Sequence, residues 1–204
     1  ASKLAVQQAV AFAKGILGSG DIFTEKHLME LAESIYDTLE ELAQNKQVAL
    51  NEFSCTLLGF IILADQACFL QIGDGAIVRN DGSGHYTHLW WPHNGEYQNT
   101  TTFLIDDPNF RNLKTKIIQG SIQEVAIFTD GLQMLTLNNE SESVHQPFFK
   151  DLFKWLRMVK NEEHLTILNG KLSAYLSGNA INSRTDDDKT LLLATRLNHD
   201  GAEL

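Results

Sequence analysis

The feature that most constrains the fold is the separation of helix-forming from strand-forming sequence along the chain. Residues 1–18 and 24–47 place apolar side chains at helical spacing, and residues 53–90 alternate short apolar runs with turn residues. Two more helix-like segments follow Pro147, and a last strand-like run covers 190–197. Because helices and strands come in blocks rather than in regular alternation, the sequence predicts an α+β sandwich and not a parallel βαβ sheet.

Each predicted helix has an apolar face that we expect to contact the core. Thr24 is a suitable N-cap for the second helix, and Gly18 and Gly20 are suitable to end the first. The aromatic residues after Pro147 are interpreted as core and not as a cofactor site. The four predicted faces are Val6, Val10, Ala13 and Leu17; Leu28, Leu31, Ile35, Leu39 and Leu42; Phe148, Leu152, Trp155, Leu156 and Val159; and Leu165, Leu168, Leu172 and Tyr175.

The strand block predicts an antiparallel arrangement. Residues Ala64-Asp65-Gln66 form one expected hairpin turn, and the run from Asn80 to Gly84 forms a second, stronger one. The expected strands are 53–63, 67–72, 75–79, 85–90, 114–119, 123–129 and 190–197. The polar stretch 95–108 lies between them and has two interpretations, a flap beside a functional site or a solvated connector.

Composition narrows the classes of partner. The length of 204 residues favours one domain, and 26 acidic against 16 basic residues give a formal net charge of −10. Such a chain repels phosphate backbones and anionic lipid, so we expect neither nucleic acid nor membrane as a partner. No apolar stretch is long enough for a membrane span and no secretory signal is present, so the expected location is cytoplasmic. Cys55 and Cys68 lie in apolar segments and are interpreted as reduced core thiols.

The predicted strand 123–129 is followed directly by a carboxylate, that of Asp130. Residues Val125 to Phe128 are all apolar, as in a strand buried on both faces, and Thr129, Asp130 and Gly131 follow directly. Asp-Gly is a common turn pair, so Asp130 has two interpretations. It either starts the next turn or binds a ligand.

Two further acidic turns adjoin apolar strands in the same way. They are Gly73-Asp74-Gly75 and Asp186-Asp187-Asp188. Carboxylates gathered at neighbouring strand ends form an oxygen-rich pocket suited to hard divalent cations. No His or Cys spacing typical of zinc competes, since His85 and His88 are expected on opposite faces of a strand. Clustering Asp186 to Asp188 costs stability unless solvent or a cation relieves the repulsion, which favours a metal.

The order and the amino-acid sequences of these turns resemble the motifs of a known family. "QIGDGAIV", "VAIFTDGLQML" and "DDDKTLLLA", together with "EFSCTLLGFIIL" and "GEYQNTTTFL", resemble the motifs of the PPM family of metal-dependent Ser/Thr protein phosphatases, in particular its bacterial branch. The resemblance runs from about Ala1 to Leu197. It implies a single domain over 1–204 with a four-layer α-β-β-α sandwich, in which helices flank two antiparallel sheets.

The resemblance also implies a site and a reaction. Asp130, with Gly131 beside it, and Asp187 would be ligands of two Mg²⁺ or Mn²⁺ ions, and Asp74 matches a weaker third metal site. Asp188 stands where the family has Asn. No protein nucleophile is implied, because a water bridging the metals attacks the phosphoryl group of phospho-Ser or phospho-Thr. The implied partners are phosphorylated proteins, in particular a Ser/Thr kinase or its targets.

One departure from the family affects the expected activity. The family has an earlier strand whose Asp-Gly pair bridges both metals, and an upstream phosphate-binding Arg; "ASKLAVQQAV" resembles the helix that directly follows that pair. The resemblance thus implies that the N-terminal portion of the domain is missing here. Without the bridging Asp, tight binding of both metals and activity are expected to be largely lost.

Three alternatives remain beside an active phosphatase. The first is a pseudophosphatase that uses the same fold as a regulatory or binding module. The second is a haloacid-dehalogenase-type phosphatase, since "GDGAIVRND" resembles its late metal motif, but the required Asp-x-Asp motif is not found upstream of Asp74. The third is a plain binding domain whose acidic turns are only turns.

Overall fold

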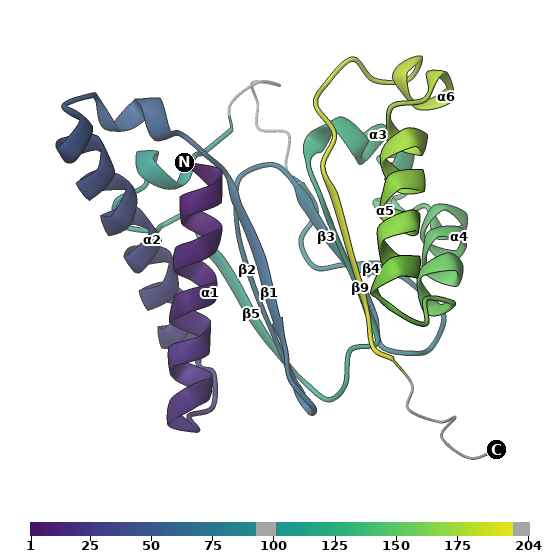
Figure 1. Ribbon diagram of the computed structural model, residues 1–204, viewed down its shortest axis with the longest axis horizontal. Helices are drawn as coiled ribbons and strands as arrows, with labels where there is room; N and C mark the ends of the chain where they lie inside the picture. Colours follow the sequence, from purple (N-terminus) through teal and green to yellow (C-terminus); the bar gives the residue numbers. More distant parts are fainter. Residues whose placement is uncertain (93–100, 198–204) are drawn as a thin grey trace. The chain divides into compact units, whose positions relative to one another are not determined.

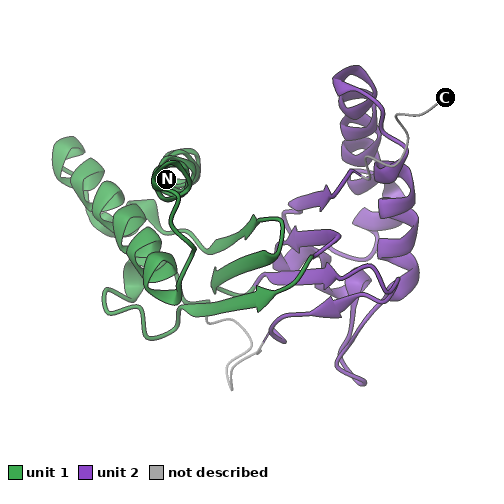
Figure 2. Cartoon of the chain, turned by 90° about the horizontal axis from the view of Figure 1, so that it is seen from below, with its two compact units in different colours: residues 1–74, 93–121 green, residues 75–92, 122–204 purple. Residues whose placement is uncertain are grey.

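The computed structural model describes residues 1–92 and 101–197, and the chain divides into two compact units. Unit 1 comprises residues 1–74 and 93–121, and unit 2 comprises 75–92 and 122–204 (Figure 2). Each unit has its own antiparallel sheet, its own helices and its own apolar core. The predicted α+β class with antiparallel sheets flanked by helices is confirmed. None of the helices in the described residues combines the length and the apolar character that crossing a membrane requires.

Two long helices, α1 (Ser2–Ser19) and α2 (Glu25–Lys46), form the helical layer of unit 1 (Figure 1). The predicted cap is confirmed: the Thr24 hydroxyl accepts a bond from the backbone N–H of His27 at 3.3 Å, and Nδ1 of the His27 ring accepts one from the Thr24 N–H. Gly20, with φ 78°, takes the left-handed conformation that ends α1. The Gln8 amide donates to the Ser34 hydroxyl at 2.6 Å and ties the two helices together.

The face of α1 that contacts the core differs from the prediction. Ala5 is buried, and Phe12 and Ile16 pack against the core, whereas Val6 and Val10 of the predicted face are exposed. Leu17 is exposed as well, and of the predicted four residues only Ala13 packs against the core. The helix is apolar on more than one side, so spacing alone fits two faces. We attribute the choice to small side chains such as Ala5, which let α1 approach α2 closely, with Phe12 filling the space beside them.

The sheet of unit 1 has the order β1-β2-β5, all antiparallel. These strands are Leu57–Ile62, Gln66–Ile72 and Lys114–Gln119, in register at Gly59↔Leu70 and Leu70↔Thr115. Every residue of the central strand β2 is buried, and Asp74 lies just beyond its end. The strand predicted from residue 53 begins only at Leu57, because a 3₁₀ turn, η1 (Leu50–Phe53), occupies the start of that segment. A second 3₁₀ turn, η2 (Leu104–Asp106), contributes Leu104 and Ile105 to the core.

The sheet of unit 2 has the order β4-β3-β6-β9, again antiparallel. The strands are Thr87–His88, Ala76–Asn80, Glu124–Phe128 and Leu191–Thr195 in that order. Ala126 and Phe128 lie on one face of β6 because strand side chains alternate. On that face the sheet packs against α4 (Gln146–Arg157) through Phe149 and Phe153.

Several predictions for unit 2 are wrong in detail. The strand expected over 85–90 shrinks to Thr87–His88, and His85 lies outside it. Phe148 and Leu156 of the predicted face of α4 pack against the core, but its fully buried residues are Phe149 and Phe153, and Trp155 is exposed. The helix α5 (Glu162–Leu176) has no fully buried residue, so its predicted apolar face is only partly covered.

Three short elements of unit 2 were not predicted. They are α3 (Gln133–Thr136), the hairpin of β7 (Leu137–Asn138) with β8 (Ser143–Val144), and α6 (Asn179–Asn182). Elements of two to four residues carry too few side chains to show a periodicity. The predicted flap or connector at 95–108 lies partly outside the described residues.

Candidate metal centre

The strand β6 carries Asp130 to an exposed position. Val125, Ala126 and Phe128 are buried, and after Phe128 the chain enters a 3₁₀ turn, η3 (Asp130–Leu132). The Leu132 N–H donates to the Thr129 carbonyl at 3.1 Å, and the Asp130 Oδ1 accepts the Gly131 N–H at 3.0 Å. Asp130 therefore shapes its own turn while its side chain stays exposed to solvent. A rigid strand end of this kind supports both roles considered for it, turn former and ligand.

Hydrogen bonds of Thr129 hold the second acidic segment beside the first. The Thr129 N–H donates to the Thr190 carbonyl at 3.2 Å, and the Thr190 N–H donates to the Thr129 hydroxyl oxygen at 3.0 Å. The Thr129 hydroxyl in turn donates to the Asp188 carbonyl at 3.3 Å. These bonds extend the β6–β9 ladder beyond both strands. The order of the ladder thus fixes the segment Asp187–Asp188 next to Asp130–Gly131.

Gly131 shows how closely the two segments approach. A Cβ atom at Gly131 would lie 2.4 Å from the Asp188 carbonyl oxygen and 3.3 Å from the Asp187 Cβ. The first distance is far below van der Waals contact, so no larger residue fits there without moving the backbone of Asp188. Of the four predicted site residues, the structure therefore brings Asp130, Gly131 and Asp187 together.

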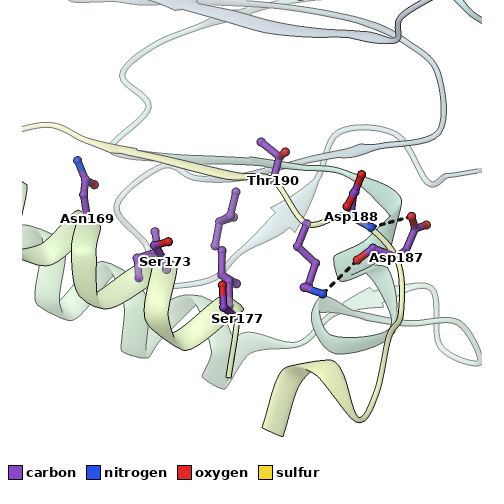
Figure 3. Close-up of a pocket in the computed structure, with 10 residues that line it drawn as sticks. Asn169, Ser173, Ser177, Asp187, Asp188 and Thr190 are labelled. Atoms are coloured by element: carbon purple, nitrogen blue, oxygen red, sulfur yellow. Dashed lines mark hydrogen bonds between the residues drawn. The ribbon is translucent and has the colours of Figure 1, made fainter. Parts of the chain in front are cut away.

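Asp187 also forms part of a cavity in unit 2, with a volume of about 520 Å³ (Figure 3). The Asp187 Oδ1 accepts the Asp188 N–H at 2.8 Å, and Lys189 Nζ donates to the Asp187 carbonyl at 3.1 Å. Asp186, Asp187 and Asp188 are all exposed. Further lining residues come from the C-terminal half of α5 and the residue that follows it: Asn169, Leu172, Ser173, Leu176 and Ser177.

The fourth predicted residue, Asp74, belongs to unit 1. It follows Gly73, whose φ of 113° favours glycine and where a Cβ would lie 2.4 Å from the Thr56 Cγ2. The Thr101 hydroxyl donates to the Asp74 carboxylate, which anchors that side chain within unit 1. A site shared by Asp74 and Asp130 stays a prediction.

The chemistry of the donors fits a divalent cation. Asp130 and Asp187 are exposed carboxylates on adjoining segments, and Mg²⁺ is commonly bound by one or two carboxylates, with waters and substrate phosphates completing its shell. Across residues 1–92 and 101–197, no three His, Cys, Asp or Glu side chains converge to form a cage for a metal ion. Asp130 and Asp187 as cation ligands therefore stay a prediction.

A second carboxylate of β6, Glu124, was missed by the sequence interpretation. It is 3% exposed, and its Oε2 accepts bonds from the Tyr86 hydroxyl at 2.6 Å and the Asn80 amide at 2.9 Å. Its Oε1 forms an ion pair with Arg157 near the end of α4. Burial first, and then the hydrogen bond to Glu124, raise the pKa of Tyr86 to about 12. The three partners of Glu124 are distant in sequence: Asn80 lies in β3, Tyr86 just before β4, and Arg157 in α4. No local pattern in the sequence could therefore have indicated this cluster.

Comparison with known proteins identifies the family. The family described as Protein phosphatase 2C matches residues 1–177, most of the chain. The chain belongs to this family. Serine/threonine-protein phosphatase 3 of Escherichia coli (strain K12) is 38% identical over 196 residues, which are 94% of this chain and 75% of that protein. The predicted resemblance to PPM-type phosphatases and the predicted enzyme class, a protein-serine/threonine phosphatase, are thereby confirmed.

Solved structures share the fold at low sequence identity. The catalytic domain of the phosphatase PstP, solved with two manganese ions, has a TM-score of 0.57 and 13% identity over 96% of this chain and 82% of its own. Stp1 from Staphylococcus aureus has a TM-score of 0.56 and 15% identity over 97% and 78% of the two chains. At such identities the likeness concerns the fold alone.

Proposed function

We propose that residues 1–204 belong to one domain that hydrolyses phospho-Ser and phospho-Thr in proteins, with Asp130 and Asp187 among the ligands of two Mg²⁺ or Mn²⁺ ions. The observation that carries this proposal is the contact of Gly131 with Asp187 and Asp188, which joins two carboxylate-bearing segments. Family membership and the relative named as a Ser/Thr phosphatase support the reaction class. The natural substrates would be phosphoproteins, in particular a Ser/Thr kinase or its targets.

We propose a role for each of these side chains. Asp130 and Asp187 would bind the cations through carboxylate oxygens, and Asp74 would hold a weaker third ion. Thr129 positions both segments through its bonds to Asp188 and Thr190. Gly131 allows the close approach. When bound, the cations would lower the pKa of water and neutralise the phosphoryl oxygens, which accounts for hydrolysis without a protein nucleophile.

The proposal is tested by metal binding and turnover measured on the same preparation. Calorimetric titration with Mn²⁺ should show binding that Asp130→Asn and Asp187→Asn each weaken at least tenfold. Turnover of p-nitrophenyl phosphate and of a phosphothreonine peptide in Mn²⁺ should fall in parallel. Unchanged Mn²⁺ affinity in both variants would overturn the metal assignment.

A pseudophosphatase is the second candidate, favoured by one specific observation. Within the described ranges 1–92 and 101–197, no three His, Cys, Asp or Glu side chains form a group that could hold a metal ion. A chain of this kind would bind phosphoproteins without hydrolysing them. Phosphopeptide binding with no Mn²⁺-dependent turnover of either substrate would support this candidate over the enzyme.

A further inference from the structure

A second cavity of unit 2 opens directly after the turn that holds Asp130. Its volume is about 540 Å³, and its walls come from α3, the β7–β8 hairpin and the first residues of α4. None of these elements contributes a proposed metal ligand. The lining residues used below are Met134, Leu135, Leu137, Glu140 and Val144.

The cavity has an apolar part with an unusual rim. Leu135, Leu137 and Val144 line it and are almost completely buried. Met134 lines it too, but its side chain is 74% exposed, the largest exposed fraction among the large apolar side chains of the described residues. Methionine is flexible and polarizable, and it is frequent on surfaces that bind several different partners. An exposed Met beside buried leucines is therefore suited to receive an apolar side chain of a ligand.

The other part of the rim is acidic. The Asn138 Oδ1 accepts the N–H groups of Glu140 and Ser141 at 3.0 and 3.2 Å, which fixes the turn between β7 and β8. Glu140 and Glu142 of this turn are both exposed, and no Lys or Arg lines the cavity. With a chain of formal net charge −10 around it, the rim favours a basic side chain in the ligand.

The cavity lies within a short reach of the candidate metal ligand. Met134 follows Asp130 by four residues in the continuous helical run of η3 and α3. At a rise of about 1.5–2 Å per residue, their Cα atoms are separated by about 6–8 Å along that run. An extended peptide advances by about 3.3 Å per residue, so two or three residues span this distance.

We propose that this cavity, which we call the Met134 groove, binds the polypeptide that flanks the phosphorylated residue of the substrate. An apolar side chain two or three residues from the phosphoresidue packs on Met134 and the leucines, and a neighbouring basic side chain lies near Glu140. The proposal rests on the proposed phosphatase function. It adds a determinant of which phosphoproteins are bound, formed by residues outside the metal centre.

Direct binding of a peptide tests the groove independently of turnover. The probe is a fluorescent phosphonothreonine peptide, which resists hydrolysis, with Leu and Arg within three residues on both sides; its counterpart has Ala at those positions. Anisotropy with the full chain in Mn²⁺ should give at least fivefold tighter binding of the Leu/Arg peptide. Met134→Ala should remove at least fivefold of that affinity, and Glu140→Gln at least twofold.

Matched controls separate the groove from general surface effects. Met158→Ala changes the same residue type at a 54% exposed position outside the cavity, and Glu163→Gln changes an exposed acid in the first turn of α5. Neither should alter peptide binding. Equal affinities for the two peptides, or equal losses in Met134→Ala and Met158→Ala, would overturn the inference. Turnover of p-nitrophenyl phosphate in the unmodified chain reports separately on the proposed function.

Discussion

The two ends of strand β6 carry carboxylates in opposite environments. Glu124 at the start is buried and accepts bonds from three side chains, Tyr86, Asn80 and Arg157. Asp130, just beyond the other end, is exposed and lies beside the Asp187 segment. A buried acid with a complete set of donors stabilises a fold, whereas an exposed acid beside other acids gains little from the protein. The contrast suits Glu124 to stabilising the fold and is the basis for testing the proposed ligand role of Asp130.

The largest effect that we predict is a loss of activity in Asp130→Asn, which tests the proposed role of the exposed acid. Because Asp130 is proposed to hold the cations that neutralise the phosphoryl oxygens, its loss should lower kcat/KM by about 100- to 1000-fold, as the removal of one electrostatic stabiliser of a transition state does. The melting temperature should stay the same or rise slightly, because Asp130 is exposed and an Asn oxygen can still accept the Gly131 N–H. Steady-state turnover in Mn²⁺ and calorimetry on one preparation measure both. A variant that loses stability and activity together would instead make Asp130 structural.

For Glu124→Gln we predict the opposite result, a loss of stability without a loss of activity. An amide offers one acceptor oxygen, but Tyr86 and Asn80 bond to Oε2 and Arg157 bonds to Oε1, so one side must face an NH₂ group. We expect unfolding to become easier by about 1–3 kcal/mol, the usual cost of an unsatisfied buried group. Urea denaturation measures this, and turnover per folded molecule should be unchanged. A loss of activity without a loss of stability would contradict the division of roles between the two acids.

The sequence alone predicts features that depend on neighbouring residues or on the order of motifs along the chain. Thr24 was predicted as a cap because the required atoms lie within three residues, and Asp130 and Asp187 were predicted from the order of motifs. The adjacency of their segments depends on the β6–β9 register and on the space at Gly131, which only the fold provides. The face of α1 was predicted wrongly because its apolar residues fit two faces. Glu124 gave no signal at all, since its three partners are distant in sequence.

Gly131→Ala tests whether the close approach of Gly131 to Asp188 is needed at the exposed end of β6. The new methyl group would lie 2.4 Å from the Asp188 carbonyl oxygen and push the two acidic segments apart. Overpacking of this kind typically costs about 1–3 kcal/mol, and turnover and Mn²⁺ affinity should fall with it. The control is Gly170→Ala in α5, where nothing lies within 4 Å of the added Cβ and removing a helix glycine should stabilise by about 0.5–1 kcal/mol. Equal effects of the two substitutions on Mn²⁺ affinity would refute the close-approach argument.

The smallest effect that we predict is the pH dependence of stability that Tyr86 contributes. It concerns only the buried Glu124 end of β6. The pKa of Tyr86 is raised from 10.0 to about 12 in the folded chain because burial and the bond to Glu124 favour the protonated hydroxyl. The stability that this proton contributes is complete below pH 10 and is lost as the pH rises from about 10 to 12. Tyr86→Phe keeps the ring that stacks on Phe153 but removes the proton, so it should cost about 1 kcal/mol at neutral pH. Urea denaturation from pH 8 to 12 should then show a steeper alkaline decline for the unmodified chain than for Tyr86→Phe; parallel declines would mean that Glu124 is held by Asn80 and Arg157 alone.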